Sequence, residues 1–591
     1  MLPSKTIEVR LQDVIRELFP DADAGSVLVR PCPDPRFGDY QSNALMSLAK
    51  ARKMNPRQLA TDVVARLKVD DLCEKVDIAG AGFLNFKLKT SALNAALEEA
   101  ARGGPLFFEK TSRPRNIVVD FSSPNVAKPM HVGHIRSTIL GDALARVLRL
   151  IGHRVTTDNH LGDWGTQFGM LLVGWKTVLD AEALKRDPLA EMERIYKLIS
   201  GQCDPEKAGF NQATLDRARA ELVKLQSGDP ENLGVWKEMI RLSQMQFEAI
   251  YGRLDVRFDY TYGESFYNSR LQSTVEELTA RGIAVESRGA KAIMSDGSFP
   301  PKDDPFLINR DGEWVPNPFI IEKSDGAFNY ATTDLATLAF RVQTWHAEEV
   351  IYVTDGRQQL HFRQLFSAFR RWHPELPVKL AHVWFGSILG EDGKPFKTRS
   401  GETIGLADLL DEAEERALKV VTDKSPELPE AQRKEIARVV GIGAVKYADL
   451  LPNRQSDYVF SWDKLLALNG NTAPYLQYAY ARIQSIFRKG GMGDNAVIGS
   501  LTIQAPEEIT LAKHMLNFGL VLEGVVDEYR PNFLCNYLYE LAGYFTSFYE
   551  NCPVLKSEPE VRASRLILCH LTARLLRQGL ELLSIQTLEQ M

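Results

Sequence analysis

The sequence predicts an α/β protein with a Rossmann-type parallel sheet at its centre, a small α+β domain before the sheet and an all-α domain after it. The central prediction rests on one stretch in which a β-branched run, Ile117–Phe121, is followed by a Ser/Pro/Asn loop, an amphipathic helix, Ile135–Ile151, and a second strand, Arg154–Asp158. This order is the building unit of a parallel nucleotide-binding sheet. Mixed periodicity in residues 1–108 and purely helical spacing in residues 462–591 predict the two terminal domains.

The composition is that of an ordinary globular protein of several domains. Of the 591 residues, 44% are hydrophobic and 25% are charged, and the formal net charge of −6 provides no global basic field for a nucleic acid. Any contact with RNA would therefore be local and depend on shape. Six scattered cysteines without a C-x-x-C pair argue against a zinc ribbon and for reduced thiols. Because the sequence shows no apolar signal segment and no apolar run of membrane-spanning length, we expect a soluble cytoplasmic protein without a membrane contact.

The first 108 residues are predicted to form the small α+β domain. Helical spacing covers Ile7–Leu18, Asn43–Ala51 and Pro56–Leu67, and Ala81–Leu88 has the pattern of a strand. The segment Gly-Asp-Tyr-Gln-Ser-Asn leads into the second of these helices. Its Gly, Asp and Asn residues are of the types that form a turn and a helix cap.

The loop between the first central strand and its helix, residues 122–129, leads into His131-Val132-Gly133-His134. Free backbone N–H groups at a helix N-terminus attract anions such as phosphate, and Gly133 has no Cβ that would keep a phosphate or a flat base away. His131 and His134 can each donate a ring N–H to phosphate oxygens, and Lys128 adds positive charge upstream. A structural histidine pair, a metal-binding pair and a glycine needed only for packing remain alternative interpretations of the bare H-x-G-H pattern.

Residues 166–328 are predicted to be inserted into the sheet. Helical spacing dominates two long stretches, Met170–Lys197 and Asp216–Gly252, and a Gly- and Pro-rich part with Asp-Gly pairs follows them. Its charge-rich helices are most simply solvated faces. The pattern of this stretch does not identify catalytic residues.

After the insertion the sheet is expected to resume at Phe319–Glu322, to continue through Phe328–Ala331 and to pass into a helix near Thr333. A further strand, Glu349–Val353, leads into Gly356-Arg357-Gln358-Gln359-Leu360-His361. The carboxyl ends of such strands are where ligands bind in open parallel sheets.

Three polar side chains near these strand ends suit a guanidinium group. Tyr330 and Asp334 lie four residues apart across the predicted strand-to-helix junction, so both can face one cavity. A guanidinium is planar and presents five N–H donors, so a carboxylate that binds it through both oxygens is its natural partner. Asp334 meets that requirement, with Tyr330 and Gln358 as further contacts. A helix cap remains the alternative interpretation of Asp334.

A basic loop follows the strand-like run Val383–Leu389. Residues 394–401 read Lys-Pro-Phe-Lys-Thr-Arg-Ser-Gly and include Lys397 and Arg399. A loop of this composition either binds phosphate or is a solvated basic turn. Helical spacing returns from Ile404 to Val445, and Lys446–Leu451 is predicted to begin the link to the last domain.

The last domain is predicted to be all-helical, with helices at residues 471–486, Leu511–Tyr529, Phe533–Glu550 and Val561–Ile585. Near one face of the first helix lie Tyr475, Tyr478 and Arg482. Aromatic side chains suit stacking on unpaired bases, but a tyrosine stripe at helical spacing is also typical of a core.

Several of these segments resemble one family. SPNVAKPMHVGHIRSTILGDAL resembles the ATP-site segment of class I aminoacyl-tRNA synthetases, and its Ser-Pro-Asn start and Ala-Lys-Pro spacer resemble the arginyl-tRNA synthetases in particular. The resemblance continues through TTDNHLGDWGTQFG, through GDYQSN near the N-terminus and through FKTRSG, a degenerate form of the class I Lys-Met-Ser-Lys-Ser loop. It extends over nearly the whole chain.

The resemblance implies four domains and an activity. The implied domains are a tRNA-elbow-binding domain at 1–108, a class I catalytic domain at 109–405 with insertions at about 166–328, a helical connection at 406–461 and an anticodon-binding domain at 462–591. The implied activity is ATP-dependent ligation of L-arginine to tRNA(Arg) through an arginyl-adenylate, with Mg²⁺ accompanying ATP and no resident metal. A monomer is the family expectation, and tRNA is expected to be needed even for activation of the amino acid.

The resemblance also assigns residues to each substrate. Catalysis is implied for His131, His134, Lys128, Lys397 and Arg399, and ATP binding for His131, Gly133, His134 and Lys397. L-Arginine binding is implied for Ser123, Pro124, Asn125, His134, Tyr330, Asp334, Gln358 and Asp120. Binding of tRNA is implied for Tyr475, Tyr478, Arg482, Gln41 and Asn43.

One position departs from the family pattern, and two other classes of protein share part of it. The family often has Glu where this chain has Asp120, which is one methylene shorter, so that a water would bridge Asp120 to the substrate. A synthetase or nucleotidyltransferase of another specificity shares H-x-G-H, but the Tyr330/Asp334/Gln358 set argues against it. A catalytically silent tRNA-binding relative usually lacks the two histidines, and this chain has both.

Overall fold

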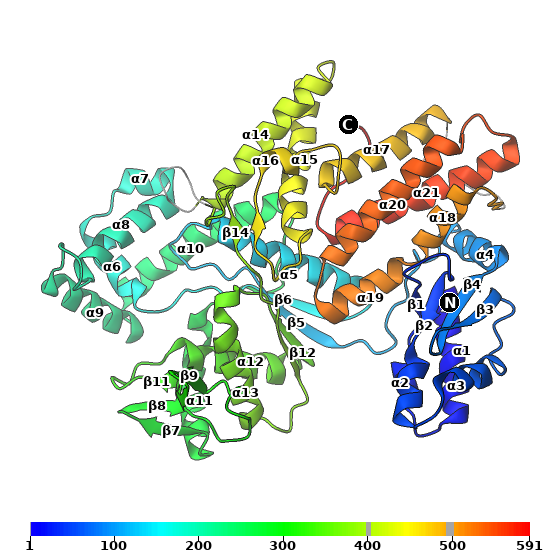
Figure 1. The fold of residues 1–591 in the computed structure, drawn as a ribbon. Coiled ribbons are helices and arrows are strands. Elements are labelled where there is room, and N and C mark those ends of the chain that lie inside the picture. The colour runs from blue at the N-terminus through cyan, green and yellow to red at the C-terminus, as the bar shows by residue number, and fades with distance from the viewer. Residues whose placement is uncertain (1, 397–403, 492–500) are drawn as a thin grey trace. The chain divides into compact units, whose positions relative to one another are not determined.

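The computed structural model describes residues 2–396, 404–491 and 501–591. They form two compact units, drawn together in Figure 1. The terminal unit comprises Met1–Thr111, Val421–Gly443 and Leu466–Met591, and the central unit comprises Ser112–Val420 and Ala444–Leu465. Two helices, α14 (Leu406–Lys424) and α15 (Glu430–Leu450), contribute to both units.

The central unit contains the predicted parallel sheet. Its strands are β5 (Asn116–Asp120), β6 (Arg154–Asp158), β12 (Glu349–Tyr352) and β13 (Lys379–His382), in the order β13-β12-β5-β6. All three neighbouring pairs are parallel. Helix α5 (Val132–Leu150) joins β5 to β6, as Figure 1 shows, and α13 (Gln359–Trp372) joins β12 to β13. The Rossmann-type prediction is confirmed.

The order of the strands locates a binding crevice. From β5 the chain proceeds to β6 on one side and later returns to β12 on the other, so the strand order reverses between β5 and β12. Ligands of open α/β sheets bind outside the carboxyl ends of the strands at such a reversal. The two strands beside this crevice are firmly packed, because all four residues of β12 are buried and Val118 and Val350 join one hydrophobic core with Leu335 and Leu365.

Two predictions about the second half of the sheet are wrong. Phe319–Glu322 is a strand, β11, but it belongs to a separate antiparallel sheet of order β11-β8-β7, with β8 (Ala290–Ile293) and β7 (Ala284–Ser287). The helix expected near Thr333, after a strand through Ala331, begins earlier, as α12 (Tyr330–Thr344). It starts there because the Asn329 side chain accepts a hydrogen bond from the backbone N–H of Tyr330 at 2.9 Å.

The insertion is helical, as predicted, and its Asp-Gly turn is confirmed. The helices are α6 (Gln167–Thr177), α7 (Ala181–Arg186), α8 (Pro188–Cys203), α9 (Gln212–Gln226), α10 (Pro230–Arg253) and α11 (Asn268–Ala280). Strands β9 (Leu307–Arg310) and β10 (Glu313–Pro316) form a hairpin closed by Asp311 and Gly312. Both turn residues have positive φ, 53° and 90°, which is the geometry of a two-residue hairpin turn.

Residues after β13 are less regular than predicted. The expected strand Val383–Leu389 is a strand only at its end, where β14 (Ile388–Leu389) pairs in parallel with β15 (Tyr458–Val459). The link expected from Lys446 is wrong, because α15 continues to Leu450. The short helix α16 (Trp462–Leu465) is the last element of the central unit.

The terminal unit combines the two ends of the chain. Its N-terminal part has helices α1 (Pro3–Leu18), α2 (Ala44–Ala51), α3 (Pro56–Val64) and α4 (Thr90–Ala101) and an antiparallel sheet of order β1-β2-β4-β3, formed by β1 (Arg30–Pro31), β2 (Tyr40–Ser42), β3 (Cys73–Ala79) and β4 (Phe83–Leu88). Its C-terminal part has helices α17 (Ala473–Lys489), α18 (Pro506–Met515), α19 (Phe518–Glu528), α20 (Asn532–Asn551) and α21 (Pro559–Leu582). The α+β and all-α predictions are confirmed.

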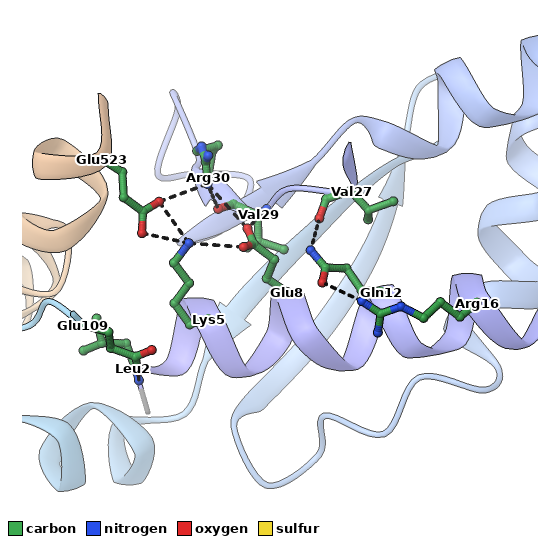
Figure 2. Close-up of polar contacts among 10 residues, drawn as sticks. All are labelled: Leu2, Lys5, Glu8, Gln12, Arg16, Val27, Val29, Arg30, Glu109 and Glu523. Atoms are coloured by element: carbon green, nitrogen blue, oxygen red, sulfur yellow. Dashed lines mark hydrogen bonds and ion pairs between the residues drawn. The ribbon is translucent and has the colours of Figure 1, made fainter. Parts of the chain in front are cut away.

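Polar contacts join the two parts of the terminal unit. Figure 2 shows Lys5 of α1 reaching between Glu8 and Glu523, and its ammonium lies 2.9 Å from the Glu523 carboxylate of α19. Lys513 of α18 pairs with Asp39 at 2.7 Å. Asp39 is the acidic residue of the Gly-Asp-Tyr-Gln-Ser-Asn segment, so in this structure its carboxylate joins the N-terminal sheet to the C-terminal helices.

Among the described residues, a single stretch, Pro506–Glu528, is long and apolar enough to cross a membrane by length and composition. Half of its most apolar window is buried inside the protein, and the stretch divides into α18 and α19. Core helices of globular proteins pass the same test, so this feature is weak support for a membrane span.

Candidate active site

The two histidines of the H-x-G-H pattern cap helix α5 and present matching ring nitrogens. Nδ1 of His131 accepts a hydrogen bond from the backbone N–H of Gly133 at 3.1 Å, and Nδ1 of His134 accepts one from the backbone N–H of His131 at 3.0 Å. Together they form a capping box. Because each Nδ1 is an acceptor, each neutral ring carries its proton on Nε2. The structural interpretation of the pair is therefore correct, and it leaves two Nε2–H donors for a ligand.

Burial keeps both rings neutral. It lowers the pKa of His134 to about 3 and lowers that of His131, where the positive charge of Arg357 adds to the effect. The ring centroids lie 4.0 Å apart. Two neutral donors at the N-terminus of a helix, at the carboxyl end of β5, suit the oxygens of a nucleotide phosphate.

The loop that precedes this corner is strained. Ser122, Ser123 and Ala127 have positive φ of 74°, 49° and 62°, a conformation that costs about 1–2 kcal/mol for a residue other than glycine. Buried hydrogen bonds hold it in place: the backbone N–H groups of these three residues donate to Ser137, Asn159 and Ser243, and the Ser122 hydroxyl bonds with Tyr251. Sequence analysis did not identify these four supporting residues.

The predicted arginine-contacting residues of this loop differ in exposure. Asn125 is exposed, Ser123 is half-buried and Pro124 is buried. A Cβ on Gly162 would lie 2.2 Å from Oδ1 of Asn125, so glycine at 162 leaves the space that the Asn125 side chain occupies.

Asp120 ends β5 and is neutralised from within the protein. Its carboxylate lies 2.7 Å from the guanidinium of Arg341, and Oδ1 accepts a hydrogen bond from the Ser123 hydroxyl at 3.0 Å. Arg341 is fully buried and also pairs with Asp158 at the end of β6, at 2.7 Å. The Asp120 carboxylate thus has two partners before any substrate binds.

One of the three predicted phosphate-binding cations, Lys128, lies among the described residues, three residues before His131. The ammonium of Lys128 lies 4.7 Å from the centre of the Tyr196 ring, over its face. Lys397 and Arg399 lie outside the described residues. The chain that follows them pairs with the histidine corner, since the backbone N–H of Val132 donates to Ile404 at 3.0 Å.

Two of the predicted guanidinium-binding residues, Tyr330 and Asp334, lie on α12, and the third, Gln358, lies immediately before α13. Because α12 begins at Tyr330, Tyr330 and Asp334 lie one turn apart on the same helical face. His361, near the start of α13, lies 2.5 Å from Oδ2 of Asp334 through Nε2, and Gln358 is exposed one turn earlier. The alternative interpretation of Asp334 as the helix cap is wrong, because Asn329 caps α12.

A second carboxylate, which sequence analysis missed, lies close enough to Asp334 to interact with its charge. The pKa of Glu264 is raised to about 7, mainly by burial and also by the charges of Asp334 and Asp163, while His160 opposes the rise. Asp163 holds the Glu264 turn, because its carboxylate accepts hydrogen bonds from the backbone N–H and the hydroxyl of Ser265, at 2.8 and 2.6 Å. The only signal in the sequence was an acidic residue after a glycine, within Tyr-Gly-Glu-Ser.

In the terminal unit, two of the predicted tRNA residues line one cavity. Tyr478 and Arg482 of α17 line a cavity of about 680 Å³ with Lys489, Tyr549 and Lys556. The guanidinium of Arg482 lies 4.4 Å from the centre of the Tyr549 ring. A cavity with aromatic and basic side chains suits an unpaired nucleotide.

The tyrosines of α17 divide between core and surface. Tyr478 is 47% exposed, so the core interpretation is wrong for it, whereas Tyr480 is fully buried. Tyr475 is half-buried, with its ring 5.7 Å from that of Tyr539.

Near the N-terminus, the two other predicted tRNA residues also differ in exposure. Gln41 is half-buried in β2, whereas Asn43 is exposed. Asn43 precedes α2 without a capping hydrogen bond from its side chain, so the cap interpretation is wrong for this residue.

Among the described residues, no group of three or more His, Cys, Asp or Glu side chains is arranged to hold a metal ion.

Comparison with known proteins gives matches along nearly the whole chain. The model of the catalytic domain of class I (R) tRNA synthetases matches residues 97–462, that of the arginyl tRNA synthetase N-terminal domain matches 5–88 and that of the DALR anticodon binding domain matches 476–591. The arginine--tRNA ligase of Hahella chejuensis is 46% identical over 575 residues, covering 96% of each chain. That of Nostoc sp. is 45% identical over 608 residues, covering 99% of each chain.

Two solved structures are similar over the full chain. The arginyl-tRNA synthetase of Thermus thermophilus has a TM-score of 0.83 at 26% identity and covers 100% of both chains. That of Plasmodium falciparum has a TM-score of 0.80 at 29% identity and covers 100% of this chain and 99% of its own.

Proposed function

The chain belongs to the arginyl-tRNA synthetases of class I, and from this premise we propose how its side chains bring about the ligation of arginine to tRNA. The enzyme ligates L-arginine to tRNA(Arg) with ATP, through the adenylate that class I synthetases form. The single observation that supports our assignment is the pair of Nε2–H donors at the start of α5, after the carboxyl end of β5. The charge of Asp334 adds to burial in raising the pKa of Tyr352, so Asp334 lies near the carboxyl end of the neighbouring strand β12.

In the first step, an oxygen of the arginine carboxylate attacks the α-phosphorus of ATP in line. The bond from that phosphorus to the oxygen of the β-phosphate breaks, and pyrophosphate leaves. The attacking carboxylate is already ionised, so the step needs no general base, and catalysis consists of positioning and of stabilising charge on phosphate oxygens. His131 and His134 donate hydrogen bonds from Nε2–H to those oxygens, and the positive end of the α5 helix dipole adds to the same field.

Further cations complete the ATP site in this proposal. Lys128, Lys397 and Arg399 neutralise the phosphates, and Gly133 allows the nucleotide to approach the backbone. For Lys397 and Arg399 the support is the sequence of the loop alone. Mg²⁺ enters with ATP and supplies charge neutralisation at the phosphate oxygens.

The arginine side chain is bound opposite the phosphates. Asp334 binds the guanidinium through both carboxylate oxygens, and Tyr330 and Gln358 contact its edges. Glu264 is a second carboxylate for the same cation. The α-amino and α-carboxylate groups of arginine are held by residues of the loop and the ends of its flanking elements: Ser123, Pro124, Asn125, His134 and, through a water, Asp120.

We predict that arginine binding depends on pH through Glu264. Its pKa of about 7 in the free enzyme means that the carboxyl is largely protonated below pH 7, whereas the guanidinium favours the ionised form. Arginine binding then releases a proton below pH 7, so the KM for arginine should fall about tenfold per pH unit as pH rises toward 7, and should level off above it. Steady-state aminoacylation from pH 5.5 to 8.5 measures this.

Glu264→Gln is the matched variant for the pH dependence. We expect it to remove the slope and to leave a KM for arginine above the wild-type value at pH 8. The KM for ATP at each pH is the internal control. A wild-type KM for arginine that is flat through pH 7 would contradict the assignment.

The tRNA is bound at both ends of the chain in this proposal. Tyr478 and Arg482, with Tyr475, contact the anticodon loop from residues 462–591, and Gln41 and Asn43 contact the elbow from residues 1–108. Transfer of arginine from the adenylate to the terminal ribose of the tRNA releases AMP. We also propose that the enzyme acts as a monomer in the cytoplasm.

We predict that the cavity on α17 contributes to tRNA affinity. Tyr478→Ala and Arg482→Ala should each weaken tRNA binding about 5- to 150-fold, because stacking on an unpaired base contributes about 1–3 kcal/mol. Filter binding or the KM for tRNA measures the change. Tyr544→Ala is the control, since Tyr544 is 38% exposed on the neighbouring α20 and does not line this cavity. Equal effects of the Tyr478 and Tyr544 variants would overturn the assignment.

The assay that tests the proposed specificity is amino-acid-dependent exchange of pyrophosphate into ATP, with and without tRNA. We expect exchange with arginine, and not with lysine or glutamine, and only when tRNA is present. A preference for lysine would refute the guanidinium site, because an ammonium cannot form the two parallel hydrogen bonds. Full exchange without tRNA would refute only the requirement for tRNA.

A further inference from the structure

We propose that His361 is a positioning residue that fixes the orientation of the Asp334 carboxylate for the guanidinium of arginine. This inference rests on the proposed role of Asp334 and adds a residue that contacts no reacting atom. It starts from the position of His361 on α13, one turn after Gln358 and in contact with Asp334 of α12.

His361 lies where these residues converge. It is in the first turn of α13, which follows β12 at the crevice, and Gln358 lies one turn before it. Its Nε2 is 2.5 Å from Oδ2 of Asp334, and its ring centroid is 5.0 Å from that of Tyr330. One imidazole therefore contacts both residues of α12 that are proposed to recognise arginine.

The ring has little freedom to move. Its side chain is 15% exposed, and the rings of Phe319 and Phe362 lie 5.5 and 5.3 Å from it, centroid to centroid. Phe319 belongs to β11 and Phe362 is the next residue of α13, so the imidazole packs against rings from two elements. A donor held this firmly specifies a direction for the group that accepts from it.

The His361 ring makes one hydrogen bond within the described chain, and it is with Asp334. Nδ1 is buried and has no hydrogen-bond partner among the residues that the structure describes. Nε2 faces Asp334, so the proton of a neutral ring lies on Nε2 and is donated to Oδ2. The imidazole thus donates its one N–H to the Asp334 carboxylate. Nδ1 has no hydrogen-bond partner in the described chain, so the ring is oriented by its contact with Asp334 and by packing.

The consequence concerns the plane of the carboxylate. A carboxylate can bind a guanidinium through two parallel hydrogen bonds only when its plane and that of the cation coincide. Oδ2 has two lone pairs, so it can accept from His361 and from the substrate at once. With Oδ2 fixed by His361, rotation of the Asp334 carboxylate about its last bond is restricted before arginine arrives, and less ordering remains for the binding step.

Two substitutions separate the hydrogen bond from the packing. His361→Phe keeps a ring among Phe319, Phe362 and Tyr330 but removes the donor, whereas His361→Gln places an amide N–H near the position of Nε2. Because hydrogen bonds to charged groups are the stronger ones, we expect His361→Phe to raise the KM for arginine about 10- to 100-fold. We expect His361→Gln to restore most of that loss.

The split between kinetic constants identifies a positioning role. In His361→Phe, kcat at saturating arginine should fall less than about threefold and the KM for ATP should stay at the wild-type value, because the phosphate site is untouched. A parallel rise of the KM for ATP, an unchanged KM for arginine, or a Gln variant as impaired as the Phe variant would each overturn the inference. Should His361→Phe fail to fold, His361→Asn takes its place, since its shorter amide does not reach the position of Nε2.

A double-mutant cycle with Asp334→Asn distinguishes this inference from the proposed function. If His361 acts through Asp334, His361→Phe adds no further loss in an Asp334→Asn background. If Asp334→Asn loses arginine and His361→Phe does not, His361 has no positioning role and the guanidinium site stands. If Asp334→Asn itself binds arginine as the wild type does, the proposed guanidinium site is wrong.

Discussion

Replacing His131 with asparagine should lower the rate of arginyl-adenylate formation about 100- to 1,000-fold and leave the protein folded. The reason is that His131 has two separate functions. Its Nδ1 caps α5 by accepting from Gly133, and its Nε2–H is free for a phosphate oxygen. Asparagine is a preferred N-cap residue and keeps the first function, but its shorter side chain does not supply the second donor at the same place.

Single-turnover formation of the adenylate measures this effect, and thermal unfolding monitors the cap. His131→Ala is the matched comparison, since it removes both the cap and the donor and should also lower the free energy of unfolding by about 0.5–2 kcal/mol. Binding of tRNA should be unchanged in both variants. Near-wild-type activity of His131→Asn would show that the histidine serves only the helix.

The second large effect is expected at Asp334. Removing one partner of a desolvated charge pair costs about 2–5 kcal/mol, so Asp334→Asn should lower kcat/KM for arginine roughly 30- to 5,000-fold while the KM for ATP stays unchanged. Aminoacylation at varied arginine and at varied ATP measures both quantities. Asparagine preserves the shape of the side chain, so the loss reports the charge.

Asp325→Asn is the control for Asp334. Asp325 is exposed in the turn before α12, where Oδ1 accepts from the backbone N–H of Ala327 at 3.0 Å. Its removal should leave both KM values at wild type. Equal losses in the two variants would show a general effect on α12 and would exclude a guanidinium contact at Asp334.

The stretch β5, α5 and β6 was predictable because each of the three elements is specified by its own local sequence. The β-branched run before Phe121, the apolar stripe of α5 and the following strand agree with the structure to within a few residues at each end. The H-x-G-H corner follows from the same stretch. Its tautomers do not, because they depend on which backbone N–H groups each Nδ1 meets once α5 has formed.

The errors lie where a short pattern fits two structures. Phe319–Glu322 is apolar over four residues, too few to distinguish a buried parallel strand from the half-exposed antiparallel β11. The start of α12 depends on a single hydrogen bond from Tyr330 to Asn329. Because α12 begins at Tyr330, Tyr330 and Asp334 lie on one helical face, and their binding of a guanidinium stays a prediction.

Glu264 and His361 were not predicted as site residues because their roles arise only from long-range contacts. Glu264 acquires its raised pKa from burial and from Asp334, which is distant in sequence. His361 meets Asp334 only because α12 and α13 pack against the same face of the parallel sheet. The spacing of residues around Glu264 or around His361 does not predict that either side chain lies near Asp334.

The central claim is that neutral imidazole donors bind the nucleotide phosphate while Asp334 binds the guanidinium across the same crevice. The most direct test is a crystal structure of the enzyme with tRNA and a non-hydrolysable analogue of arginyl-adenylate. We expect Nε2 of His131 or His134 within about 3.2 Å of a phosphate oxygen, and both Asp334 oxygens at similar distances from guanidinium nitrogens. Imidazoles turned away from the phosphate, or a guanidinium bound without Asp334, would contradict the account.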